Sequence, residues 1–89
     1  MNVFISHASA DDRFVERLAA RLDRAGIDVW HDARNLRAGH QFGQEIQQAI
    51  DNADAVLIVY SRAAARSDWV TGEFEYARNA GKKLIVLWK

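Results

Sequence analysis

The stretch Ala55-Val-Leu-Ile-Val-Tyr60 decides the fold, because its six apolar residues follow one another without a polar interruption. Such a run is typical of a parallel β-strand that is buried on both faces of a sheet. A second run, Leu84-Ile-Val-Leu-Trp88, follows a segment with helical spacing and predicts another buried strand. Together the two runs indicate a parallel sheet with a helix in the crossover.

Two shorter runs extend the pattern toward the N-terminus. Asn2–Ser6 and Ile27–Trp30 are rich in β-favouring residues, and we expect each to form a strand. Between them, Asp11–Ala25 has apolar side chains at helical spacing and arginines at other positions, which predicts an amphipathic helix ended by Gly26. The sequence Ser9–Asp12 matches Ser-x-x-Asp and predicts a capping box at the start of this helix.

Two more helices are expected, over Phe42–Asp51 and from Ser67 to Ala80-Gly81, whereas His31–Gln41 has no periodicity and is expected to form a long loop. Alternating strands and helices predict an α/β fold. The last strand is followed by one residue and by no helix to cover it, and an apolar edge strand is an aggregation hazard. We therefore expect the chain to be part of a longer protein.

Composition narrows the class of protein. A length of 89 residues indicates a single domain. The 12 basic and 12 acidic side chains give a formal net charge of 0, which argues against direct nucleic-acid binding. The absence of cysteine excludes a disulfide scaffold and thiolate chemistry. No apolar run approaches the ~20 residues that cross a bilayer. A cytoplasmic protein without a membrane contact is expected.

Ligands of open α/β sheets bind outside the carboxyl ends of the strands. We therefore compared these segments with a dinucleotide site, a P-loop and the phosphoacceptor site of a receiver domain. The first strand is followed by Ser-His-Ala-Ser-Ala-Asp and not by the glycines of a dinucleotide site, and no P-loop is present. The third strand ends in Val-Tyr-Ser, without the aspartate of a phosphoacceptor receiver domain. The separations of His7, His31 and His40 match no common metal motif, so no metal site is expected.

One acidic residue stands out on the last helix. Glu73 lies one turn after Trp69, within an apolar stripe that continues through Phe74 and Ala77. A carboxyl group there must be desolvated, paired, or facing a cleft. The alternative is that Glu73 lies at the margin of the stripe and meets an arginine. Helical spacing turns Glu75 away from Trp69 and predicts that it is exposed.

In combination, these segments resemble a TIR (Toll/interleukin receptor) domain of the bacterial type. The resemblance runs over all 89 residues and rests on several motifs in the family's order. The motifs are Val-Phe-Ile-Ser-His-Ala-Ser-Ala-Asp-Asp (3–12), Gly-Ile-Asp-Val-Trp-His-Asp (26–32), Asn-Leu-Arg-Ala-Gly (35–39), Ala-Asp-Ala-Val-Leu-Ile-Val-Tyr-Ser (53–61), Ser-Asp-Trp-Val-Thr-Gly-Glu (67–73) and Lys-Lys-Leu-Ile-Val-Leu (82–87).

The resemblance implies a flavodoxin-like parallel sheet with strand order 2-1-3-4, and residues 1–89 as a TIR domain that lacks the family's fifth strand and last helix. In enzymatic members the glutamate that matches Glu73 is catalytic for cleavage of the nicotinamide–ribose bond of NAD⁺. NAD⁺ is then the substrate, and no cofactor or metal is implied.

The resemblance also implies further residues around the substrate. Ser6, His7 and Ala8 would line the nucleotide and Trp69 would form a wall of the pocket, although for Ser6 a hydrogen bond to backbone is the alternative. The remaining positions belong to the loop His31–Phe42, which in the family lies over the site or reaches a neighbouring copy; they are Asp32, Leu36, Gly39 and Phe42. Many family members carry a proline in this loop and this chain has none.

Three functions are compatible with this resemblance. The first is an NAD⁺-consuming effector, activated when a sensor domain in the same or a partner chain brings copies together through the loop His31–Phe42, with antiphage defence as the implied process. The second is a non-catalytic module that binds other TIR domains. The third is a sensor that binds NAD⁺ or ADP-ribose without turnover.

Overall fold

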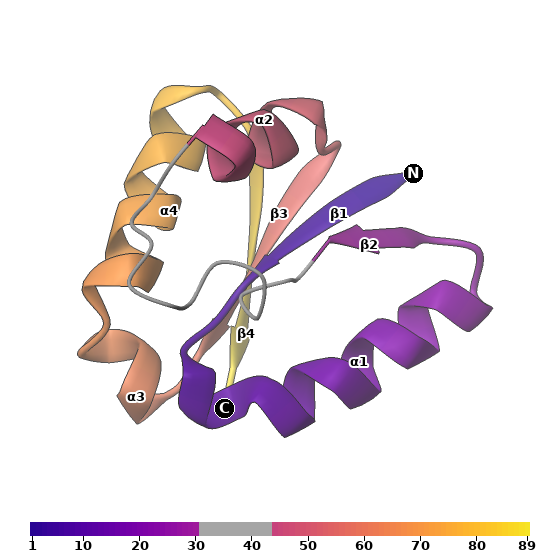
Figure 1. The fold of residues 1–89 in the computed structure, drawn as a ribbon, viewed down its shortest axis with the longest axis horizontal. Helices are drawn as coiled ribbons and strands as arrows, with labels where there is room; N and C mark the ends of the chain where they lie inside the picture. The colour runs from indigo at the N-terminus through magenta and orange to yellow at the C-terminus, as the bar shows by residue number, and fades with distance from the viewer. Residues whose placement is uncertain (31–43) are drawn as a thin grey trace.

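The computed structural model describes residues 1–30 and 44–89. Within these residues a single parallel sheet has the strand order β2-β1-β3-β4, which confirms the predicted α/β class and the order 2-1-3-4 (Figure 1). The strands are β1 (Asn2–Ser6), β2 (Asp28–Trp30), β3 (Ala55–Tyr60) and β4 (Lys83–Trp88).

Helices cover the two faces of the sheet unequally. The helices are α1 (Asp12–Arg24), α2 (Gln44–Asn52), α3 (Arg62–Ala65) and α4 (Asp68–Asn79), and a 3-10 turn, η1 (Ser9–Asp11), precedes α1. Helix α1 lies on one side of the sheet, and α2, α3 and α4 lie on the other (Figure 1). Both faces carry apolar side chains for the helices to cover, because the period of two along each strand sends neighbouring side chains to opposite faces.

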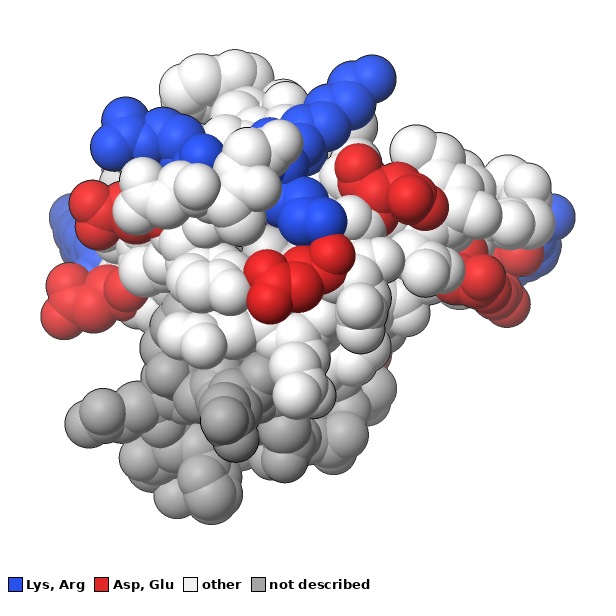
Figure 2. Space-filling model, turned by 90° about the horizontal axis from the view of Figure 1, so that it is seen from above, with Lys and Arg blue, Asp and Glu red and all other residues white. Residues whose placement is uncertain are grey.

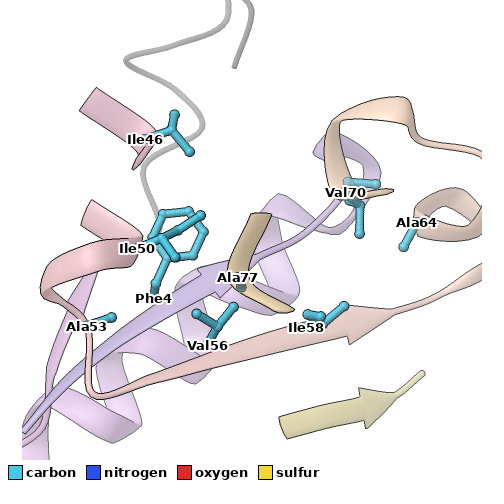
Figure 3. Packing of buried hydrophobic residues seen from close by; sticks show 10 residues of the cluster. Phe4, Ile46, Ile50, Ala53, Val56, Ile58, Ala64, Val70 and Ala77 are labelled. Carbon is cyan, nitrogen blue, oxygen red and sulfur yellow. The ribbon is translucent and has the colours of Figure 1, made fainter. Parts of the chain in front are cut away.

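Strand β1 shows the alternation clearly. Val3 and Ile5 pack with Val15 of α1, whereas Phe4 packs with Ile50 of α2 on the opposite face. Figure 3 shows the hydrophobic cluster on the face that α2 covers, in which Phe4 lies against Ile50. Ser6, two residues after Phe4, therefore belongs to the face that α2 and α4 cover.

Serine side chains begin the two helices that follow β3. Ser67 Oγ accepts a hydrogen bond from Val70 N–H at 3.2 Å, so α4 begins where the sequence predicts. Ser61 Oγ accepts from Ala64 N–H at 3.1 Å and starts α3, which was not predicted because four residues are too short to show a helical period. The capping box predicted over Ser9–Asp12 is wrong, since the N-cap residue of α1 is Asp11 and makes no side-chain capping bond.

Strand β4 is less buried than its sequence predicts. Leu84 and Leu87 pack against the cores on the two faces of the sheet. However, Ile85 and Val86 are 40% and 42% exposed and Trp88 is 75% exposed. The prediction of a buried strand is therefore wrong, because β4 lies at the edge of the described sheet and most of its side chains are exposed there.

The surface of the described residues carries mixed charge. On the face seen in Figure 2, lysine and arginine side chains alternate with aspartate and glutamate side chains. Among the described residues, no helix is both long and apolar enough to cross a membrane.

Two glycines are expected to respond oppositely to the same substitution. Gly26 has a φ of 85°, which costs an L side chain about 1–2 kcal/mol, so Gly26→Ala is expected to lower the free energy of unfolding. Gly72 lies inside α4 and a Cβ there meets no atom within 4 Å, so Gly72→Ala is expected to raise that free energy by about 0.5–1 kcal/mol. Urea denaturation of both variants checks the two signs, and a shift in the same direction contradicts the expectation.

Candidate functional site

A small pocket lies where β1 and β2 end and α4 passes over the sheet. It brings together three of the residues predicted for the site, His7 and Trp69 beside Glu73. The remaining residues of its wall are apolar or aromatic, and the described set is Phe4, Ile5, His7, Trp30, Ile46, Trp69 and Glu73. This is the edge of a parallel sheet at which ligands bind.

Glu73 is the acidic residue among the described residues of this wall, and 1% of its surface is exposed. Ser6 Oγ donates a hydrogen bond to Glu73 Oε1 at 2.5 Å, and the Trp69 side chain, whose indole N–H can only donate, also hydrogen-bonds the carboxyl group. Burial raises the pKa of Glu73 to about 8, against the lowering effect of these two hydrogen bonds. The placement of Glu73 at the margin of the stripe is therefore wrong.

Ser6 is likewise almost fully buried, at 1% exposure. Its hydroxyl reaches across from β1 to α4, so the alternative of a hydrogen bond to backbone is not what the structure contains. Glu75, by contrast, is exposed, as the helical spacing predicts. The two glutamates of α4 thus occupy different environments although they are two residues apart.

His7 begins the loop after β1 and is 4% exposed. Its Nε2 lies 2.9 Å from Asp12 Oδ1, at the first residue of α1. Its Nδ1 is buried and, among the described residues, has no hydrogen-bond partner. Sequence reasoning did not identify the contact with Asp12, because the capping box assigned that carboxylate to the backbone of α1.

The neighbouring Asp11 ties the ends of two other strands to the same loop. It accepts hydrogen bonds from Ser61 Oγ at 2.5 Å and from Lys89 Nζ at 2.9 Å. Burial alone would raise the pKa of Asp11, but the two hydrogen bonds and the charge of Lys89 outweigh it, so the pKa is lowered. The loop that carries His7 is therefore held by an ionised carboxylate at its base.

The other predicted residues are distributed as follows. Ala8 is buried in the core cluster with Phe4 and is not part of the pocket wall. Four predicted positions lie outside the described residues, and they are Asp32, Leu36, Gly39 and Phe42. Within residues 1–30 and 44–89, no group of three histidine, aspartate or glutamate side chains is arranged to hold a metal ion.

The aromatic wall was missed by sequence reasoning. Trp30 stacks on Phe4 with ring centroids 5.1 Å apart and an interplanar angle of 15°, and both rings border the pocket. The sequence places Phe4 and Ser6 on one face of β1, but the pairing of Trp30 with Phe4 depends on the register of β1 and β2, which the sequence alone does not give.

Comparison with known proteins agrees with this geometry. A profile of the TIR domain family matches residues 3–88. The chain is 34% identical to the 2′ cyclic ADP-D-ribose synthase AbTIR of Acinetobacter baumannii, over 98% of this chain and 34% of that protein. It is 29% identical to the NAD(+) hydrolase PdTIR of Paracoccus denitrificans, over 98% of this chain and 31% of that protein. The chain thus spans about a third of the length of these curated relatives.

Among solved structures, the TIR domains of the activated Roq1 resistosome superpose with a TM-score of 0.79 at 25% sequence identity, over 98% of this chain and 56% of that one. The strand order, the site at the carboxyl ends of the strands and the match over residues 3–88 lead to one conclusion. This chain belongs to the TIR domain family.

Proposed function

We propose that this chain is the catalytic domain of an NAD⁺ glycohydrolase, with Glu73 as its catalytic residue. The observation that carries the proposal is a carboxyl group that is 1% exposed yet forms part of a pocket wall. Relatives named NAD(+) hydrolase and 2′ cyclic ADP-D-ribose synthase support the same substrate. A purely structural role would not require an acidic side chain at a position that an apolar one could fill.

Cleavage of the nicotinamide–ribose bond can be catalysed by a carboxylate such as that of Glu73. The bond between ribose C1′ and the nicotinamide nitrogen breaks with its electron pair going to nitrogen, so nicotinamide leaves as a neutral molecule and needs no general acid. The ribose gains oxocarbenium character, which a carboxylate in a low-dielectric pocket stabilises. Water, or a hydroxyl of the substrate itself, then adds to C1′ and loses a proton, which yields ADP-ribose or a cyclic form.

The donors around Glu73 give its carboxylate a fixed position. Ser6 approaches from β1 and Trp69 from one turn earlier on α4, so two rigid elements orient one functional group. Such preorganisation is what makes electrostatic stabilisation effective in a dry site, because no solvent must reorient during the reaction. Ser6 and Trp69 act as positioning groups, with Trp69 also forming a wall of the pocket.

We also propose how the activity is controlled and which process it serves. Activity requires self-association through the loop 31–42, under the control of a sensor domain in the same or a partner chain, and it serves antiphage defence in the cytoplasm. NAD⁺ is a substrate in this scheme, and neither a nucleic acid nor a membrane is a direct partner. The support is the resemblance to bacterial TIR proteins and the mixed charge of the described surface (Figure 2).

Replacement of the acid tests the proposal directly. Glu73→Gln keeps the side-chain volume but cannot carry the negative charge, and NAD⁺ cleavage is expected to fall by on the order of 10²- to 10³-fold. The matched control Glu75→Gln alters an exposed acid on the same helix and is expected to retain the parent rate. Nicotinamide release by the assembled protein is the measurement, and a Glu73→Gln variant with the parent rate would refute the proposal.

The pH profile tests which form of the acid reacts. Because the pKa of Glu73 is raised to about 8 and the carboxylate is the active form, kcat/KM for NAD⁺ is expected to rise with pH and to level off above about 8. The positive charge that develops on the bound substrate favours the carboxylate, so kcat is expected to level off at lower pH. A kcat/KM that falls between pH 6 and 8 contradicts the carboxylate role.

The free energy of unfolding is expected to change with pH in the opposite direction. The folded pKa of about 8 lies above the ordinary value of 4.5, so the folded state holds the proton more tightly than the unfolded state. The free energy of unfolding is therefore expected to be highest below about pH 4.5 with respect to this group, and to fall by a few kcal/mol as pH rises to about 8. Denaturation curves of the parent and Glu73→Gln at several pH values should show this fall only in the parent.

A further inference from the structure

The buried imidazole of His7 has one ring nitrogen that no described residue satisfies. The side chain is 4% exposed and borders the pocket that Glu73 also lines, and its Nδ1 has no hydrogen-bond partner among the described residues. Buried polar atoms are nearly always hydrogen-bonded, so an unsatisfied nitrogen on a residue that lines a pocket calls for a partner. The partner can come from a bound ligand.

The contact with Asp12 determines what His7 can offer to that ligand. Asp12 Oδ1 lies 2.9 Å from Nε2, and an ionised carboxylate can only accept, so Nε2 carries the hydrogen. In the neutral ring the other nitrogen, Nδ1, then holds a lone pair and acts as an acceptor. Asp12 is the first residue of α1, so this tautomer is selected by a group on a rigid element.

We propose that Nδ1 of His7 accepts a hydrogen bond from a hydroxyl of the substrate's nicotinamide ribose, and that Asp12 is the positioning residue that keeps His7 in the required tautomer. This inference rests on the proposed function and names the group of NAD⁺ that the pocket recognises. A neutral acceptor suits a hydroxyl and not a phosphate, which has no hydrogen to donate when ionised. With the carboxylate of Glu73 in the same wall, the pocket presents two acceptors, which match the two adjacent hydroxyls of a ribose.

The tautomer is tested without reference to activity. Nitrogen-15 NMR of the parent protein is expected to show Nε2 of His7 protonated and Nδ1 unprotonated. In Asp12→Asn the amide can donate to Nε2, so the Nδ1–H tautomer is expected to increase. Asp23→Asn, an exposed position on the same helix, is the matched control and is expected to leave the His7 signals unchanged. A parent protein with hydrogen on Nδ1 overturns the proposal.

Recognition of the hydroxyl is tested with two NAD⁺ analogues, one lacking the 2′-hydroxyl and one lacking the 3′-hydroxyl of the nicotinamide ribose. The parent is expected to discriminate against each by on the order of 10- to 100-fold in kcat/KM, because a pocket acceptor loses its donor. In both His7→Phe and Asp12→Asn, discrimination against one analogue is expected to fall at least about tenfold while discrimination against the other persists. Unchanged discrimination in both variants overturns the proposal.

Failure of the proposed function gives a different result. A parent protein that cleaves no NAD⁺ in any assembled state refutes the glycohydrolase assignment and leaves the His7 inference to be judged by binding. ADP-ribose is then titrated into the nitrogen-15-labelled protein. A shift of the Nδ1 signal that is absent in Asp12→Asn supports the hydrogen bond to ribose, and no shift at saturating concentration overturns it.

Discussion

The burial of one carboxyl group is the constraint on which the site depends. Glu73 takes a place on α4 that an apolar residue would fill at lower cost, and it remains there because Ser6 and Trp69 each give it a hydrogen bond. The bond to Ser6 joins the central strand β1 to the helix above it. The buried carboxyl group and the core of the domain are therefore parts of the same packing arrangement.

Much of the sheet could be predicted because buried parallel strands leave a strong signal. The run Ala55–Tyr60 coincides with β3, and Asn2–Ser6 coincides with β1. The sequence also narrowed the position of Glu73 to two alternatives, burial or the margin of the apolar stripe, because its spacing from Trp69 places both residues on one face of α4. Which of the two applies depends on Ser6, whose contact joins residues 67 positions apart in the chain.

Other features depend on contacts that leave no local pattern. Hydrophobicity alone suggested that β4 is buried, but its burial depends on what lies beyond the sheet edge, and Ile85 and Trp88 are exposed. The pairing of His7 with Asp12 competes with a capping motif that the sequence assigns to Ser9 and Asp12, and the contact with His7 prevails. Family resemblance alone supplied the roles of the loop 31–42, since its sequence has no period to interpret.

Two consecutive aspartates where the 3-10 turn η1 meets α1 have partners in different parts of the domain. Asp11 holds Ser61 and Lys89, which follow β3 and β4, while Asp12 holds His7. Because the two residues are adjacent in the chain, a backbone shift that moves one carboxylate also moves the other. A rearrangement at the far edge of the sheet would thus be transmitted to the imidazole of His7, through two neighbouring residues that join β4 to the loop after β1.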